Sequence, residues 1–102
     1  MTTKKYGFLV VTIRVNSEPG EESWESLEQT FNKAKDWLRF STGIYFLFTS
    51  QTPRTWFERI QATRDMPSSY SVLIAPVDLS QRSGQNTNKV WDWIKKNSAR
   101  QE

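Results

Sequence analysis

The chain has 102 residues, which is enough for one small domain and too few for two. It contains no cysteine and no histidine, which excludes disulfides, thiol nucleophiles, zinc fingers and imidazole general bases. The net charge is only +3, and the longest nearly apolar run, Ile44–Phe48, is far shorter than a membrane span of about 20 residues. No small-residue cleavage site of a signal peptide follows the first apolar stretch. We therefore expect a cytoplasmic protein without a membrane partner, with a single domain over residues 1–102.

The first predicted elements are a strand and a helix. Near-continuous apolarity and β-branched residues indicate a strand over Tyr6–Val15 that is buried on both faces. The turn residues of Asn16–Gly20 end this strand, and Ser23 is the predicted N-cap of the helix that follows. That helix begins near residue 22 and ends between residues 34 and 38. Its apolar side chains are spaced three and four apart, and they are Trp24, Leu27, Phe31, Ala34 and Leu38.

The segment Asp36–Ser50 is compatible with two structures. In one, the helix continues through Leu38 and a single strand begins near Gly43. In the other, the helix ends near residue 35, and Trp37–Phe40 and Ile44–Thr49 form a hairpin whose turn uses the freedom of Gly43 to adopt a positive φ. We favour the hairpin, because a sheet of only three strands would shelter the five tryptophans poorly.

A second helix is predicted after the hairpin. Thr52-Pro53 provides a hydroxyl N-cap followed by proline at the first helical position. The helix carries Trp56, Phe57 and Ile60 on its inner face and ends near Arg64.

The last part of the chain contains one more strand and one more helix. Tyr70–Val77 is predicted to be a buried strand, with Pro76 at its end or on a sheet edge because proline lacks a backbone donor. Residues 79–88 are polar and rich in turn formers, which predicts a mobile loop. A final short helix over Lys89–Asn97 follows, and the tail at residues 98–102 is expected to fray.

With the hairpin, the element order is βαββαβ followed by a helix. This is the order of a split-βαβ domain, in which four strands form one sheet and both central helices pack on the same face. The sequence therefore predicts an α+β fold with a ferredoxin-like βαββαβ sheet, helices on one face and an additional C-terminal helix.

The same succession of elements resembles the small CRISPR adaptation-subunit family and its uncharacterised ferredoxin-like relatives. The similarity covers nearly the whole chain, by the order and spacing of elements rather than by a strict motif. Its features are the opening strand, the Pro19-Gly20 turn, the Ser41-Thr42 turn, the aromatic strand Tyr45–Phe48 and the ending Trp91–Asn97. The resemblance implies a short chain that forms a symmetric dimer and that binds nucleic acid.

The chain differs from that family at the end of the first strand, where the family carries its metal-binding residue. Active members carry an acidic residue at the end of the first strand, which is thought to hold a divalent metal at the dimer axis. Here Val11–Val15 contains no carboxylate, and Arg14 stands where the acidic residue is expected. Because a cation opposes the binding of Mg²⁺, we expect no metal-dependent nuclease activity, no catalytic set, no metal and no cofactor.

The aromatic residues are more numerous than a small core usually encloses. There are fourteen, and five of them are tryptophan. Trp91 and Trp93 are two positions apart on a helix and point to different faces, so at least one is expected to be exposed or at an interface. They are the candidate interface residues of a homodimer that forms across an open sheet edge. Aromatic rings beside cations also stack on unpaired bases, whereas rings that only seal the core would have no binding role.

The positive charge is concentrated in the later part of the chain. Residues 31–102 contain eleven cations and six anions, whereas five glutamates lie in the region of the first helix. The candidate phosphate contacts are the cations nearest the C-terminus, namely Arg82, Lys89, Lys95, Lys96 and Arg100. The leading hypothesis is a non-catalytic, homodimeric interaction or assembly module. The alternative is a basic nucleic-acid-binding subunit that resembles the CRISPR adaptation family but lacks its metal-binding residue.

Overall fold

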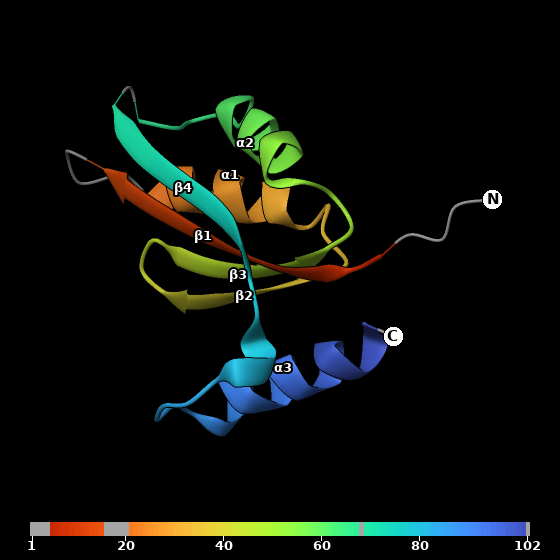
Figure 1. The fold of residues 1–102 in the computed structure, drawn as a ribbon. Coiled ribbons are helices and arrows are strands. Elements are labelled where there is room, and N and C mark those ends of the chain that lie inside the picture. The colour runs from red at the N-terminus through yellow and green to blue at the C-terminus, as the bar shows by residue number, and fades with distance from the viewer. Residues whose placement is uncertain (1–4, 16–20, 68, 102) are drawn as a thin grey trace.

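The computed structural model describes residues 5–15, 21–67 and 69–101. In chain order, these residues form strand β1 (Gly7–Val15), helix α1 (Glu21–Phe31), strand β2 (Asp36–Ser41), strand β3 (Ile44–Thr49), helix α2 (Pro53–Gln61), strand β4 (Tyr70–Val77), the short 3₁₀ helix η1 (Leu79–Gln81) and helix α3 (Asn88–Arg100) (Figure 1).

The four strands form one antiparallel sheet in the order β2-β3-β1-β4, so the fold class is α+β. The predicted hairpin is confirmed, because β2 pairs with β3 directly across the turn. Helix α1 ends at Phe31, so the prediction of an end between residues 34 and 38 was wrong, and Leu38 lies in β2. Strands β2 and β4 are the two edges of the sheet.

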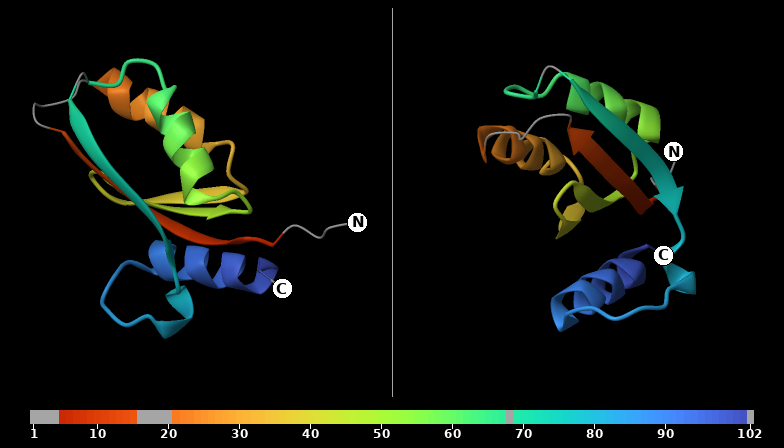
Figure 2. Two further views of the ribbon diagram at one scale, coloured as in Figure 1. Left: turned by 45° about the horizontal axis from the view of Figure 1, so that its top comes forward. Right: turned by 90° about the vertical axis from the view of Figure 1, so that its left-hand side faces the viewer.

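Helices cover both faces of the sheet. Helices α1 and α2 lie against one face, and α3 lies against the other (Figure 2). The first face contains the main core, which consists of Leu9, Val11, Ile13, Leu27, Phe31, Tyr45, Leu47, Trp56 and Ile60. The second face contains the second core, which consists of Phe8, Leu38, Phe48, Leu79, Val90, Trp93 and Ile94. Consecutive residues of β1 point to opposite faces, so this strand contributes to both cores, as its unbroken apolarity predicts.

The hairpin turn depends on a single glycine. Gly43 has a φ of +80°, a region that favours glycine, and its carbonyl oxygen accepts a 2.7 Å hydrogen bond from the backbone N–H of Ile13. A Cβ at this position would lie 2.4 Å from the carbonyl oxygen of Ile13. The close approach of the turn to the central strand therefore requires a residue without a side chain.

The predicted N-cap of α1 was wrong, although the helix begins within one residue of its predicted start. Helix α1 begins at Glu21, so Ser23 lies within its first turn and is not its N-cap. The Ser23 hydroxyl instead donates to the main-chain carbonyl oxygen of Asp65, and the Ser26 hydroxyl donates to the Asp65 carboxylate at 3.1 Å. These bonds hold the segment after α2 against α1. The predicted turn at Asn16–Gly20 lies outside the described residues.

Helix α2 differs from its prediction on its outer flank. Thr52 caps its N-terminus and Pro53 is its first residue, as predicted. Trp56 and Ile60 are fully buried, but the expectation that Phe57 lies on the inner face was wrong, since its side chain is 37% exposed. Helix α2 packs against β4, which is an edge strand. No further strand of the sheet lies beyond β4 to cover the outer flank of α2.

Strand β4 has the predicted bounds but is not buried on both faces. Leu73 is 64% exposed, and Ser71 on the same face is exposed as well. The prediction of a buried strand was wrong because β4 is an edge strand and α3 packs against β2 at the other side of the sheet. The placement of Pro76 on a sheet edge is confirmed.

Helix α3 is longer than predicted, and one carboxylate of β2 adds polar contacts to its apolar packing on the sheet. It continues to Arg100, so part of the expected tail at residues 98–102 is helical. The Asp36 carboxylate oxygen Oδ2 lies 3.0 Å from Lys96 Nζ and 3.8 Å from Arg100 Nη1, and it accepts a 3.1 Å hydrogen bond from Asn97 Nδ2. Burial raises the pKa of Asp36, but the hydrogen bonds from Asn97, Lys96 and neighbouring groups outweigh it, so the pKa is below its usual value.

The Gly43 turn can be tested by substitution. Gly43→Ala should destabilise the protein by about 1–3 kcal/mol or more, because alanine must adopt a left-handed conformation and meets the Ile13 carbonyl. Urea unfolding measures this loss. Gly7→Ala is the matched control, since its added Cβ has only Gln101 Nε2 nearby, at 3.8 Å. Equal midpoints for the two variants would contradict this account of the turn.

The Asp36 anchor predicts a pH-dependent contribution to stability. A carboxylate whose folded pKa lies below its unfolded value stabilises above the unfolded pKa, and this contribution is lost as the pH falls through the folded pKa. Asp36→Asn should therefore cost about 1–3 kcal/mol at neutral pH, and the difference from the wild type should shrink as the pH falls below about 4.

Denaturant unfolding across a pH series measures this difference. Asp92→Asn is the control, because Asp92 is exposed on the same helix and forms no ion pair among the described residues. A difference between Asp36→Asn and the wild type that stays constant with pH would show that charge on Asp36 does not hold α3.

Candidate interaction surfaces

The two tryptophans proposed for an interface lie in different environments. Trp93 is only 8% exposed and packs in the second core, with its ring centroid 5.8 Å from that of Phe8. Its buried indole nitrogen has no hydrogen-bond partner of normal geometry among the described residues, although the indole contributes to the lowered pKa of Asp36. Trp91 is half-buried and lies at the border of the second core. Of the pair, Trp91 is the ring that a partner can reach.

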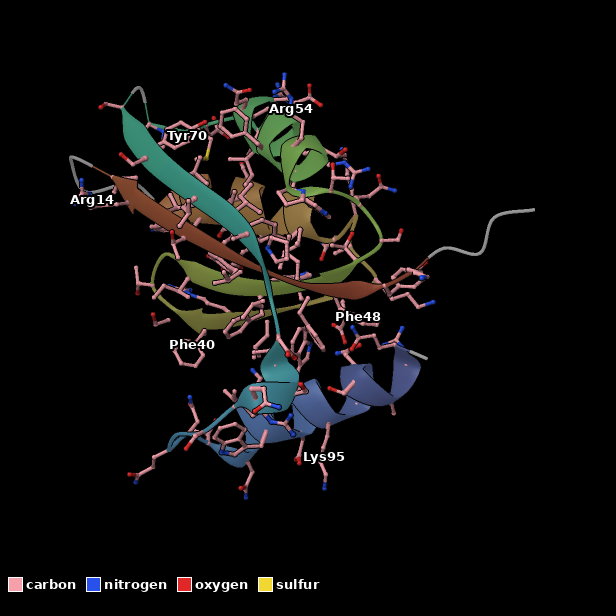
Figure 3. All side chains as sticks on the ribbon, in the orientation of Figure 1. Arg14, Phe40, Phe48, Arg54, Tyr70 and Lys95 are labelled. Carbon is pink, nitrogen blue, oxygen red and sulfur yellow. The ribbon has the colours of Figure 1, made fainter. Side chains whose placement is uncertain are left out.

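The five candidate phosphate contacts do not form one cluster. Lys96 and Arg100 are paired with Asp36, and the Arg100 guanidinium also lies 5.7 Å from the centre of the Phe48 ring. Lys89 and Lys95 are exposed, and Lys95 projects from the outer side of α3 (Figure 3). The fifth cation, Arg82, lies after η1. Two of the five cations are therefore paired with a carboxylate of the fold, and the other three form no ion pair among the described residues.

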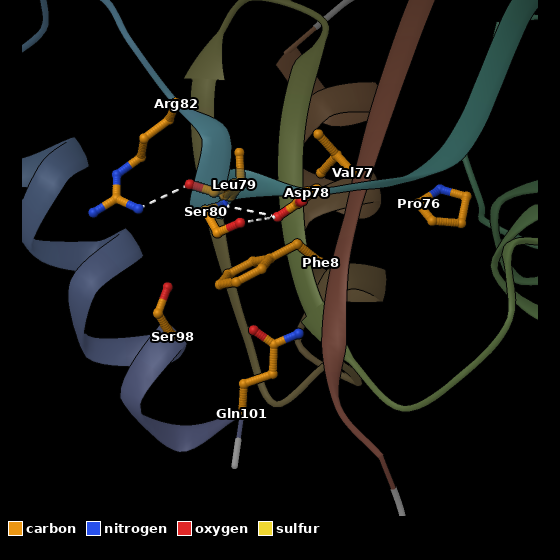
Figure 4. Close-up of a pocket in the computed structure, with 9 residues that line it drawn as sticks. All are labelled: Phe8, Pro76, Val77, Asp78, Leu79, Ser80, Arg82, Ser98 and Gln101. Atoms are coloured by element: carbon orange, nitrogen blue, oxygen red, sulfur yellow. Dashed lines mark hydrogen bonds between the residues drawn. The ribbon is translucent and has the colours of Figure 1, made fainter.

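A cavity of about 740 Å³ lies between η1 and the C-terminal part of α3 (Figure 4). Phe8, Val77 and Leu79 provide apolar lining, and Asp78 and Arg82 provide opposite charges. Asp78 Oδ1 accepts hydrogen bonds from the Ser80 hydroxyl at 2.6 Å and from the Ser80 N–H at 2.9 Å. Both bonds lower the pKa of Asp78, so the carboxylate stays charged at neutral pH.

A smaller cavity, called here the α3 pocket, lies beneath the loop that leads into α3. Its volume is about 260 Å³. Phe40 and Phe46 of the sheet and Trp91 of α3 line it together with Arg82, and both Arg82 and Leu79 also line the larger cavity. The remaining lining residues are Ser83, Gly84, Gln85, Asn86, Val90 and Ile94. The structure thus brings together two predicted site residues, Arg82 and Trp91.

The β4 edge is an apolar surface that sequence reasoning missed. Among the described residues, the exposed large apolar side chains are Leu73, Phe57 and Phe40, and the first two lie at or beside β4. A hollow of about 470 Å³ adjoins Leu73 on the sheet face, and a shallow groove of about 290 Å³ separates it from Phe57 of α2. The sequence signal for this edge was Pro76, which marks an edge strand without showing which side chains it leaves exposed.

The two sheet edges differ in regularity. Strand β2 has a register shift between Arg39 and Ser41, and such an irregularity interrupts an edge and discourages its pairing. Strand β4 pairs with β1 in continuous register from Tyr70 to Val77. An unpaired backbone edge is therefore most regular along β4, where the exposed leucine also lies.

Among the described residues, the buried titratable side chain of Tyr45 belongs to a network within the fold. Burial, together with a 2.9 Å hydrogen bond to Glu28, raises the pKa of Tyr45, so its phenol stays protonated and cannot act as a base. Glu28 Oε2 also lies 3.7 Å from Arg39 Nη1, which makes this group an internal ion-pair network. Within the part of the chain that the structure describes, no three acidic residues gather in a way that could hold a metal ion. The helices in that part are all too short or too polar to cross a membrane.

No protein-family model, curated protein or solved structure matches this chain. Its function is therefore inferred from its own residues and their geometry.

Proposed function

We propose that this protein is a non-catalytic assembly module that pairs with a second copy of itself along the β4 edge. The observation that carries the proposal is the 64% exposure of Leu73 in the middle of a regular, unpaired edge strand. Open edges add a strand readily, and exposed apolar side chains on such an edge favour a protein partner over water.

The alternation of side chains along β4 supports one register for this pairing. Val72 and Ile74 pack against the main core, whereas Leu73 faces the other side of the sheet. Directly opposite residues of an antiparallel pair have their side chains on the same face of the sheet. When a two-fold axis perpendicular to the sheet relates two β4 strands, one residue must therefore lie opposite its own copy. An axis at Leu73 places this leucine against its own copy and sets Val72 opposite Ile74 of the second copy.

Pro76 shows which backbone groups of β4 point outward. Pro76 has no N–H and is tolerated on an edge where its nitrogen faces solvent. Backbone groups alternate in direction along a strand, so Val72 and Ile74 then direct their N–H and C=O groups outward as Pro76 does. In the proposed register Val72 and Ile74 exchange hydrogen bonds with the second copy, whereas Pro76 has no N–H to donate. The Leu73 residues form the closer type of pair, with Cα atoms about 4.5 Å apart.

The fold type is part of the same proposal. The βαββαβ order, the antiparallel strand order β2-β3-β1-β4 and the position of α1 and α2 on one face support a ferredoxin-like domain to which α3 has been added. Self-association is also what the resemblance to the CRISPR adaptation-subunit family implies. At the end of β1, Arg14 is exposed and has no carboxylate of β1 beside it, which supports a role without metal chemistry.

The proposed pairing predicts the effect of a single charge. Wild-type protein at about 100 μM should have the mass of a dimer by light scattering. Leu73→Asp should give a monomer, because burying an unpaired carboxylate at the two-fold axis is unfavourable. The monomer should stay folded, since the leucine is exposed and such surface changes cost only about 0.5 kcal/mol.

Phe40→Asp is the control for this experiment, because Phe40 is also an exposed ring but lies on the opposite sheet edge. It should leave the dimer intact, and moderate salt should weaken the wild-type dimer little, because the contact is apolar and formed by backbone groups. A wild-type monomer at this concentration, or a Leu73→Asp dimer, would contradict the proposal.

A further inference from the structure

We propose that the α3 pocket binds a single unpaired nucleobase together with its phosphate. The base lies among Phe40, Phe46 and Trp91, and the phosphate lies at Arg82. This inference does not rest on the β4 pairing, because the pocket lies on a different part of the molecule.

The aromatic walls are exposed enough to receive a ring. Phe40 is 42% exposed, and Phe46 and Trp91 are half-buried. Phe40 and Phe46 contact each other edge to face, with centroids 5.5 Å apart and an interplanar angle of 76°, which holds both rings in place. The pocket of about 260 Å³ is slightly smaller than the roughly 300–1,000 Å³ of typical small-molecule sites. It is therefore suited to one ring system rather than to a large cofactor.

The charge of the pocket selects an anionic ligand. Arg82 is its only charged lining residue, and it forms no ion pair among the described residues. Arg82 Nη1 donates a 2.8 Å hydrogen bond to the carbonyl oxygen of Leu79, which positions the side chain and leaves other guanidinium N–H groups for a ligand. The first turn of α3 also borders the pocket through Val90 and Trp91, and the N-terminal end of a helix favours negative charge.

The larger neighbouring cavity lacks these properties. It contains the charged carboxylate of Asp78 and borders the C-terminal end of α3 at Ser98 and Gln101. Both the carboxylate and the helix C-terminus repel a phosphate. A phosphate held by Arg82, which lines both cavities, is therefore more stable on the side of the α3 pocket.

Polar groups of the loop distinguish a base from a plain hydrocarbon ring. Gln85 and Asn86 line the pocket and carry side-chain amides, which offer both donors and acceptors to the edge of a base. The Asn86 oxygen accepts a 3.2 Å hydrogen bond from the Thr87 N–H, so its amide donors remain for a ligand. A paired base is stacked inside a duplex and cannot enter such a pocket, so the ligand is unpaired.

The first experiment uses small probes with the wild-type protein. Adenosine monophosphate, adenosine and ribose phosphate are titrated while the indole N–H signals are followed by NMR, with the Trp91 signal assigned from Trp91→Phe. Adenosine monophosphate should shift the Trp91 signal and bind at least about tenfold more tightly than either fragment, since each fragment lacks the ring or the anion. A Trp91 signal that does not respond to adenosine monophosphate would overturn the proposal.

The second experiment uses variants matched in charge. Arg82→Gln should weaken binding of adenosine monophosphate by about tenfold, whereas Lys89→Gln should change it by less than about twofold, because Lys89 does not line the pocket. Trp91→Ala should weaken binding by about tenfold or more, and Trp91→Phe should retain most of it while keeping the helix packed. Equal losses for Arg82→Gln and Lys89→Gln would show diffuse attraction by positive charge and would overturn the site.

The third experiment identifies the source of the nucleotide. A labelled single-stranded oligodeoxythymidine and a duplex containing it are compared by fluorescence anisotropy. Binding of the single strand more tightly than the mononucleotide, with the same loss in Arg82→Gln, indicates an unpaired strand as the ligand. Binding of the mononucleotide alone indicates a free nucleotide. Equal binding of duplex and single strand would overturn the proposal, because a duplex offers no free base.

Discussion

Strand β1 lies in the sheet interior and carries apolar side chains on both of its faces. Leu9, Val11 and Ile13 point to one face and Phe8 to the other, so a single layer of helices would leave part of β1 in water. Helices α1 and α2 cover the first face and α3 covers part of the second. The chain therefore needs its C-terminal helix to complete the core, which explains why Trp93 is buried there.

The position of α3 has consequences for the charged residues. A carboxylate at the start of β2, Asp36, receives Lys96, Asn97 and Arg100 from one flank of the helix. Lys96 and Arg100, which the sequence groups with the candidate phosphate contacts, thus pair with Asp36 within the fold. Because the helix is held on the β2 side, it leaves Leu73 on the β4 side exposed. The same arrangement produces the proposed interface.

The two proposed sites use different chemistry and lie on different elements. The β4 edge offers backbone groups and aliphatic surface, which suit a second protein chain. The α3 pocket offers rings, amides and one unpaired cation, which suit a planar anion. Neither site uses Tyr45, whose raised pKa and hydrogen bond to Glu28 make it part of the internal structure. A module that pairs through one surface can therefore carry one pocket in each copy.

Local sequence patterns were sufficient for most of the elements. Thr52-Pro53 marked the start of α2, Gly43 marked the hairpin turn, and the apolar run at Tyr70–Val77 gave the bounds of β4. These features depend on backbone preferences of a few neighbouring residues, such as proline at the first helical position and glycine at positive φ. The N-cap assignment of Ser23 was wrong because a local pattern does not report contacts with remote residues. The Ser23 hydroxyl bonds to Asp65, which is remote in the sequence.

The residues alone showed the absence of cysteine and histidine chemistry, the surplus of aromatic rings and cations, and the order of strands and helices outside Asp36–Ser50, where two structures remained open. Which aromatic rings and which cations are available to a partner depends on the folded arrangement. Trp93 is buried while Trp91 is accessible, and Lys96 and Arg100 are paired while Arg82 lines a pocket. The physical reason is that exposure and charge pairing depend on which face α3 covers, and that follows from contacts between residues far apart in the chain, such as Asp36 with Asn97.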